Sequence, residues 1–274
     1  WIPLFGKIIA LGHLWFLWNL FLYSLLCIPI FHMVQKNPDG KFARFLRSTF
    51  TLKGGLGIFI LFPTLLTITE LLFKPWFPGF IGIGYEWVWY LVFFIFGYIC
   101  IVSRELYYSF LSSNKNLITG LTLILTVAFV VIRLQQHEDG IPYMDGGWIE
   151  NDIIHNQMTI LGCFIHSFHA WFWCLTVFAW GAHFLNKNSA SLAYLNQGVY
   201  PFYIVHMPLT FAGLSIAKEF GSTGIPAVLL SCVFVTAGCW MIFEVVRRTV
   251  VTRYLFGIKN TKQKQSISQN IDQL

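Results

Sequence analysis

The chain of 274 residues is strongly apolar, since 56% of its residues are hydrophobic, 18% are aromatic and only 11% are charged. Soluble domains carry about 25% charged residues, and disordered segments are poor in aromatic side chains, so both classes are excluded. The composition therefore indicates an integral membrane protein. The excess of basic residues, which gives a formal net charge of +6, therefore has to be interpreted for a membrane protein.

Seven apolar segments are long enough, or nearly long enough, to cross a bilayer as helices, which takes roughly 20 residues. The segments are continuous, whereas the strands of a membrane barrel alternate apolar and polar residues. The sequence therefore predicts an all-α polytopic membrane helix bundle. In chain order the seven segments cover residues 11–31, 54–73, 87–102, 117–133, 158–184, 198–217 and 225–246.

The loops between these segments alternate between basic and non-basic, which predicts the orientation because Lys and Arg accumulate on the cytoplasmic side. The pattern places residue 1 outside the cytoplasm and residue 274 inside it, as expected for a multi-pass protein of the cell (inner) membrane. The net charge is then a topology signal, and no nucleic-acid partner is expected. We predict a membrane domain over residues 1–257 and a polar cytoplasmic tail over residues 258–274.

Polar side chains within the segments are candidates for function, because an ionisable group inside a membrane is costly. His13 lies near the outer end of the first segment and is followed by Trp15 and, about two turns deeper, by Asn19. An interfacial histidine in an aromatic belt is the alternative for His13.

His206 lies near the middle of the sixth segment, three residues after Tyr203, so the two can share a helix face. A histidine that only packs against a neighbouring helix is the alternative there.

Three further features could form binding sites. Arg44 and Arg47 in the first loop could hold the phosphates of a nucleotide, since Arg binds phosphate bidentately, or they only mark topology. His166 and His169 could ligate a metal, but no carboxylate lies near them on their own helix, and no metal site is predicted. The acidic loop 134–157 could line a sugar site or be a solvated connection.

Two short motifs connect these residues to a known family. The stretch HLWFL that begins at His13 resembles a segment of the acyltransferase 3 family of membrane acyltransferases. The stretch YPFYIVHMP over residues 200–208 resembles that family's PFY-[IL]-[LV]-H-x-P helix. The last segment ends with Glu244, Arg247 and Arg248. This ending resembles the branch of the family that includes the glucan succinyltransferases, in which a glutamate and basic residues also close the last span.

The resemblance implies an activity: transfer of an acetyl- or succinyl-type group from cytoplasmic acyl-CoA to a hydroxyl of an extracytoplasmic glycan. Acyl-CoA is then a co-substrate, and no bound cofactor is expected. On this hypothesis the catalytic candidates are His206 and His13, and the substrate-binding candidates are Trp15, Asn19, Tyr203, Arg44 and Arg47.

The family has ten or more membrane helices and a catalytic Arg and His on its first helix, a pair that this sequence does not contain. We therefore expect three further spans and the main catalytic base before Trp1, and no activity in this chain alone. Arg44 and Arg47 have the spacing of the family's Arg-x-x-Arg, but they follow the HLWFL segment and are not equated with it. Two alternatives lack acyl chemistry: a transporter or flippase, and a haem carrier with histidine ligands from facing helices.

Overall fold

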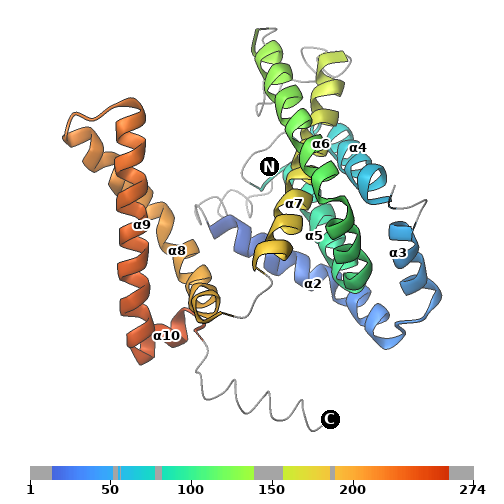
Figure 1. Ribbon diagram of the computed structural model, residues 1–274, viewed down its shortest axis with the longest axis horizontal. Helices are drawn as coiled ribbons and strands as arrows, with labels where there is room; N and C mark the ends of the chain where they lie inside the picture. Colours follow the sequence, from blue (N-terminus) through green and yellow to red (C-terminus); the bar gives the residue numbers. More distant parts are fainter. Residues whose placement is uncertain are drawn as a thin grey trace. The chain divides into compact units, whose positions relative to one another are not determined.

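The computed structural model describes residues 14–51, 55, 57–77, 82–138, 157–185 and 189–258. These residues form helices and connecting turns, with no strand among them (Figure 1). The chain divides into two compact units, unit 1 over residues 1–186 and unit 2 over residues 187–274. Unit 1 contains α2 (Trp15–Lys36), α3 (Lys41–Thr51), η3 (Gly57–Leu61), α4 (Phe62–Phe73), α5 (Tyr85–Val102), α6 (Arg104–Glu138) and α7 (Gln157–Leu185); unit 2 contains α8 (Ala190–Glu219), α9 (Gly224–Arg248) and α10 (Val250–Leu255).

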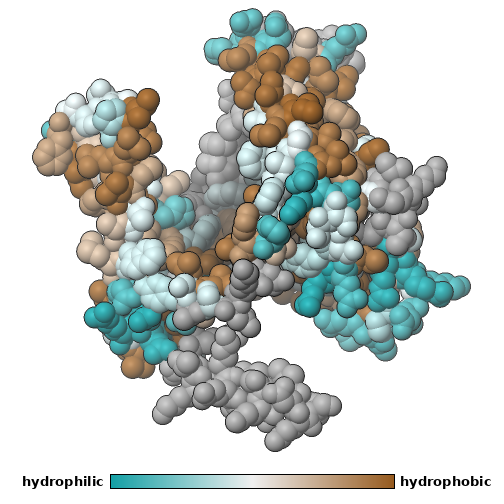
Figure 2. Space-filling model, in the orientation of Figure 1, coloured by the Kyte–Doolittle hydropathy of each residue, from teal (hydrophilic) through white to brown (hydrophobic). Residues whose placement is uncertain are grey.

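Six of these helices are long and apolar enough to cross a membrane, namely α2, α5, α6, α7, α8 and α9. The second predicted segment forms a shorter apolar helix over Gly57–Phe73, built from the π-helical turn η3 and α4. Hydrophobic side chains cover much of the visible surface of the long helices, and hydrophilic ones gather toward helix ends (Figure 2). The prediction of an all-α polytopic membrane bundle is confirmed.

Helix α6 is much longer than the segment predicted from hydropathy, because it begins at Arg104 and runs for 35 residues. The first three turns of α6 contain many polar residues, so the hydropathy of the sequence does not mark them as part of a span. Tyr107, Leu111 and Ile118 are nevertheless buried, and their spacing of four and seven residues puts them on one helix face. At 1.5 Å per residue the helix is about 52 Å long, so it extends beyond a hydrocarbon core of about 30 Å.

The first basic loop also contains a helix that hydropathy does not show. Helix α3 buries Ala43 and Leu46, whereas Lys41 and Arg44 on the same helix are exposed. A short helix with one apolar face and a basic opposite face is typical of segments that lie at the membrane surface.

The core of unit 1 is a set of aromatic side chains where α4 packs between α5 and α7. The Phe62 ring of α4 stacks on Phe96 of α5, with ring centroids 4.2 Å apart. Trp171 of α7 contacts both rings and donates its indole N–H to the carbonyl of Ile58 in η3, at 2.8 Å. Because a π-helical turn departs from the regular α-helical hydrogen-bond pattern, this bond gives a backbone group of η3 a partner in α7.

Unit 2 is a hairpin of two long helices, α8 and α9, followed by α10. Phe243 of α9 is fully buried and packs against Tyr194 and Phe202 of α8, with centroids 5.1 and 5.3 Å away. The Tyr194 hydroxyl donates to a carboxylate oxygen of Glu244 at 2.6 Å. Glu244 also lies 3.7 Å from the Arg247 guanidinium, as the i, i+3 spacing predicts.

Candidate functional site

Unit 1 contains a group of buried polar side chains that three helices bring together. Glu70 of α4 has no exposed surface, and its carboxylate is within 2.9 Å of the Lys74 ammonium. Its second oxygen lies 2.8 Å from Nδ1 of His166 and accepts a hydrogen bond from the Ser167 hydroxyl at 3.2 Å. Together with Trp89 of α5, these residues are called the Glu70 cluster below.

The positions of these residues follow from local helix geometry. Glu70 lies in the last turn of α4, and Lys74, four residues later, caps the helix with helical backbone angles, so their side chains lie on the same face. The backbone N–H of Lys74 donates to the carbonyl of Glu70, which continues the helical pattern to the lysine. A charged pair inside an apolar helix has to face protein, and here it faces α7, where His166 and Ser167 are adjacent.

Aromatic rings enclose the cluster. The indole of Trp89 stacks on the imidazole of His166, with centroids 5.3 Å apart and planes inclined by 10°. The same indole donates its N–H to the Ser167 hydroxyl at 3.3 Å. The Lys74 ammonium lies 5.0 Å from the centre of the Tyr85 ring, a cation–π distance. The imidazole plane is therefore fixed by stacking and by a hydrogen bond.

The hydrogen bonds define how the His166 ring carries its proton. A carboxylate only accepts hydrogen bonds, so Nδ1 is the donor to Glu70 and the neutral ring has its lone pair on Nε2. The positive charge of Lys74 already balances the negative charge of Glu70. The side chain of His166 is 17% exposed, against 0% for Glu70 and 4% for Lys74. The buried ion pair of Glu70 and Lys74 is therefore in contact with an imidazole that is partly exposed.

Two of the predicted substrate-binding residues come together at the turn before α5, and His13 lies outside the described residues. Asn19 is buried and donates its side-chain N–H to the carbonyl of Gly82 at 2.7 Å. Trp15 lies one turn earlier on α2 and packs on the ring of Tyr90, with centroids 5.5 Å apart. The backbone N–H of Gly82 donates to the carboxylate of Glu86 at 2.7 Å. The side chain of Asn19 therefore stabilises the conformation of this turn through its hydrogen bond to Gly82.

We predict that Gly82→Ala destabilises the protein. Gly82 has φ of +73°, a conformation that L side chains rarely adopt, and an added Cβ would collide with Trp15 and Asn19. Together these effects lower the free energy of unfolding by about 1–3 kcal/mol. Unfolding of the purified protein in detergent micelles measures the change.

Gly97→Ala is the matched control for this substitution. Gly97 lies inside α5, and no heavy atom would be within 4 Å of its added Cβ. Alanine favours a helix over glycine by about 1 kcal/mol, so this variant should be as stable as the original or more so. Equal stability of both alanine variants would contradict the role assigned to Gly82.

The predicted pair in the sixth segment, His206 and Tyr203, shares one side of α8. Nδ1 of His206 lies 2.7 Å from the carbonyl oxygen of Tyr203, and the two rings are 5.7 Å apart. A carbonyl only accepts, so Nδ1 is the donor here too. Both side chains are half-buried in unit 2, and α8 continues through Pro201 and Pro208 without ending.

The basic pair lies on α3. Arg44 is exposed, whereas Arg47 is half-buried and has an ion pair of 3.4 Å with the highly exposed carboxylate of Asp39. Exposed ion pairs of this kind contribute little to stability. Both guanidinium groups are therefore available at low cost for an anionic ligand.

The contact between Glu70 and His166 is not apparent from the sequence. The spacing of His166 and His169 suggests possible metal ligands, but no carboxylate lies near them on their own helix. The carboxylate comes from α4 instead, whereas His169 stacks on Phe129, with centroids 4.5 Å apart. Among the described residues, no group of three or more His, Cys, Asp or Glu side chains is placed to hold a metal ion.

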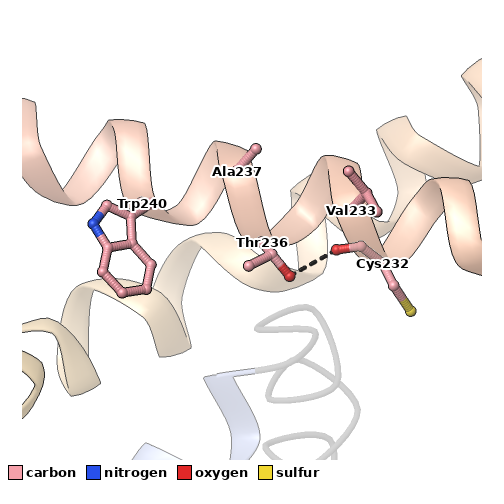
Figure 3. A pocket seen from close by; sticks show the side chains of 5 residues that line it. All are labelled: Cys232, Val233, Thr236, Ala237 and Trp240. Atoms are coloured by element: carbon pink, nitrogen blue, oxygen red, sulfur yellow. Dashed lines mark hydrogen bonds between the residues drawn. The ribbon is translucent and has the colours of Figure 1, made fainter.

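Two surface hollows are lined by other residues. One lies along α9 and has a nearly apolar lining, in which Thr236 bonds to the carbonyl of Cys232 of its own helix (Figure 3). The other lies between α6 and α7, with Arg104 and Glu105 among its lining residues. Neither lining includes a residue of the Glu70 cluster or a predicted site residue.

Comparison with known proteins gives a family match and curated relatives. The family model described as "Acyltransferase domain" (Acyl_transf_3) matches residues 1–244. Proteins named Glucans biosynthesis protein C from Escherichia coli O157:H7 and from Escherichia coli K12 (DH10B) are each 26% identical over 272 residues, covering 93% of this chain and 63% of the relative. The chain thus spans less than two thirds of the length of these relatives. No solved structure matches it.

Proposed function

This chain belongs to the acyltransferase domain family, and on that premise we propose that it is a membrane O-acyltransferase. The acyl group, of acetyl or succinyl type, moves from acyl-CoA at the cytoplasmic side to a hydroxyl of an extracytoplasmic glycan. The family match over residues 1–244, most of a chain built of membrane helices, is the observation that carries this proposal. The name of the curated relatives favours a glucan as the acceptor.

The proposed reaction exchanges a thioester for an ester. The acceptor oxygen attacks the thioester carbonyl, a C–O bond forms, and the C–S bond breaks. The hydroxyl proton passes to a protein base and then to the sulfur that leaves, so the products are the ester and free CoA thiol. Such a reaction needs a base with a pKa near neutrality, for which imidazole is suited. It also needs hydrogen-bond donors for the oxyanion of the tetrahedral intermediate.

The predicted residues take roles consistent with this chemistry. We assign His206 and Tyr203 to the lining of the polar passage that an acyl group needs through an apolar bundle. We assign His13 and Trp15 to the extracytoplasmic side of unit 1, and Asn19 supports that region through Gly82. The arginines of α3 bind the phosphates of acyl-CoA. This arrangement presupposes an inner-membrane protein with residue 1 outside and the C-terminus in the cytoplasm.

Transfer of labelled acyl groups tests the proposal. The protein, expressed from its complete gene and reconstituted in proteoliposomes, is given radiolabelled acetyl-CoA or succinyl-CoA on one side and a glucan on the other. We expect label on the glucan that mild alkali releases, as an ester requires. Movement of label or glucan across the bilayer without ester formation would instead indicate a transporter. Absence of ester with both donors would overturn the proposal.

A further inference from the structure

We propose that the hollow between α6 and α7 binds a zwitterionic aminophospholipid, with the headgroup at its charged end and an acyl chain along its apolar wall. The lipid class is phosphatidylethanolamine, whose headgroup combines a phosphate with a primary ammonium group. This binding site shares no residue with the Glu70 cluster, and the inference does not depend on the acyltransferase activity proposed above.

The first argument is the charge of the lining. Arg104 and Glu105 are adjacent at the start of α6, both are exposed, and both line the hollow. No ion pair joins either side chain to another among the residues that the structure describes. A guanidinium binds phosphate, and a carboxylate accepts hydrogen bonds from an ammonium group. The lining thus presents one group for each charge of a zwitterionic headgroup.

The second argument is the apolar wall beside these charges. Helix α7 contributes Val177, Phe178 and Leu185, whose side chains are all exposed. Tyr108 lies one turn after Arg104 and is a residue typical of the membrane interface, where its hydroxyl faces headgroups. The hollow has a volume of about 710 Å³, within the range of ligand sites. A ligand that fits the whole lining has to be charged at one end and apolar at the other.

The third argument is that packing fixes the hollow. Tyr107 of α6 is buried, and its ring packs edge-on against Phe178 of α7, with centroids 6.4 Å apart. This contact holds the start of α6 against the end of α7. Gly181 and Ala182 also line the hollow, and a Cβ added at Gly181 would meet no heavy atom within 4 Å. The space therefore results from small residues of α7 beside a fixed contact between the two helices.

The fourth argument is the depth in the membrane. Arg104 comes two residues after the end of α5, and Leu185 is the last residue of α7. On the topology predicted from the loops, both of these helix ends lie at the cytoplasmic side of the bilayer. The charged end of the hollow is then at the level of the headgroups. A lipid of the cytoplasmic leaflet can reach it without leaving the bilayer.

The charges also distinguish between amphiphilic ligands. Acyl-CoA carries several phosphate charges, which Glu105 would repel, and only one arginine lines the hollow. Phosphatidylglycerol has hydroxyls in place of the ammonium group, so it leaves the charge of Glu105 unbalanced. Phosphatidylcholine is positively charged but has no N–H to donate. Phosphatidylethanolamine is the one of these four ligands that supplies both a phosphate acceptor and an ammonium donor.

Native mass spectrometry measures this preference. The protein is expressed from its complete gene, purified in a mild detergent and titrated separately with phosphatidylethanolamine, phosphatidylcholine and phosphatidylglycerol of equal chain length. We expect the affinity for phosphatidylethanolamine to be about tenfold higher than for the other two, because only this lipid makes charge-assisted hydrogen bonds at both ends of its headgroup. Equal affinity for the three lipids would show unspecific adhesion and overturn the proposal.

Two charge variants separate the roles of the side chains. Glu105→Gln removes the partner of the ammonium group, so the affinity for phosphatidylethanolamine should fall about tenfold. The affinity for phosphatidylglycerol should rise in this variant, because a repulsive charge is lost. Arg104→Gln removes the phosphate contact and should weaken the binding of all three lipids. Unchanged affinities in both variants would mean that the lipid binds elsewhere.

The matched control for these variants is a second adjacent pair of opposite charges. Lys218 and Glu219 are exposed at the end of α8 and do not line the hollow. Changing both to Gln should alter no lipid affinity by more than about twofold, as expected for isolated exposed charges. A loss in the control as large as in the Arg104 and Glu105 variants would overturn the assignment to the hollow.

A third variant fills the hollow without changing its charge. Gly181→Leu adds an apolar side chain where the structure leaves open space, so the fold should persist and the affinity for phosphatidylethanolamine should fall at least about tenfold. Gly120→Leu on α6 is the matched control, because its added Cβ also meets no heavy atom within 4 Å and it does not line the hollow. Equal binding by the two leucine variants would contradict the proposal. Displacement of the lipid by acyl-CoA would assign the hollow to the acyl donor instead and would also overturn it.

Discussion

Lys74→Met lowers the free energy of unfolding by about 3–5 kcal/mol, the cost of leaving a buried charge without its partner. The Glu70 carboxylate is fully buried and lies 2.9 Å from the Lys74 ammonium, which is itself 4% exposed. Methionine fills similar space but cannot balance the carboxylate. Denaturant titration of the purified protein in detergent micelles, followed by tryptophan fluorescence, measures the loss.

A double-mutant cycle separates the ion pair from general effects of the substitution. Adding Glu70→Gln to Lys74→Met should recover most of the lost stability, since neither buried charge then remains. Lys218→Met at the exposed end of α8 is the control and should change the free energy of unfolding by less than about 0.5 kcal/mol. A Lys74 variant as stable as this control would mean that water reaches the carboxylate.

The spans were predictable because a bilayer imposes one strong condition, a run of apolar residues long enough to cross it. The third segment, predicted over residues 87–102, forms α5 over Tyr85–Val102. Predictions were wrong where a helix leaves the hydrocarbon region and hydropathy no longer marks it. Residues 104–116 were assigned to a loop but are the start of α6, and α3 lies within what was predicted to be a loop.

The Glu70 cluster was not predictable from the same patterns. Glu70 and His166 are 96 residues apart, and their contact depends on which faces of α4 and α7 meet. Hydropathy gives the length of a span but says little about its neighbours. One local signal existed: a Glu and a Lys four residues apart at the end of an apolar helix indicate a pair that must face protein.

Asn19 shows a different limit of sequence reasoning. Its polar side chain within an apolar segment made it a candidate, and the structure shows its amide bonded inside unit 1 to the backbone of Gly82. A polar residue in a span can contact substrate or stabilise a nearby turn, and the sequence does not distinguish the two roles. His206 and Tyr203 were expected on one helix face, and their contact within α8 follows from their spacing of three residues.

Arg44→Gln should raise the KM for acyl-CoA about tenfold, with little change in kcat. Each hydrogen bond between charged groups contributes about 1.5–3 kcal/mol, and solvent exposure on α3 reduces this toward the lower end. Arg44 is exposed, whereas Arg47 is held by Asp39, so Arg44 should contribute more to binding. Initial rates of ester formation at several acyl-CoA concentrations give both constants.

Two comparisons make this result specific to phosphate binding. Arg44→Lys keeps the charge but loses the planar fork, so its KM should lie between those of the original and the Gln variant. Lys218→Gln removes an exposed charge from α8 and should leave KM unchanged. Added salt should raise the KM of the original protein more than that of the Arg44 variant, since salt screens an attraction that the variant lacks. An unchanged KM in the folded Arg44→Gln variant would mean that acyl-CoA binds away from α3.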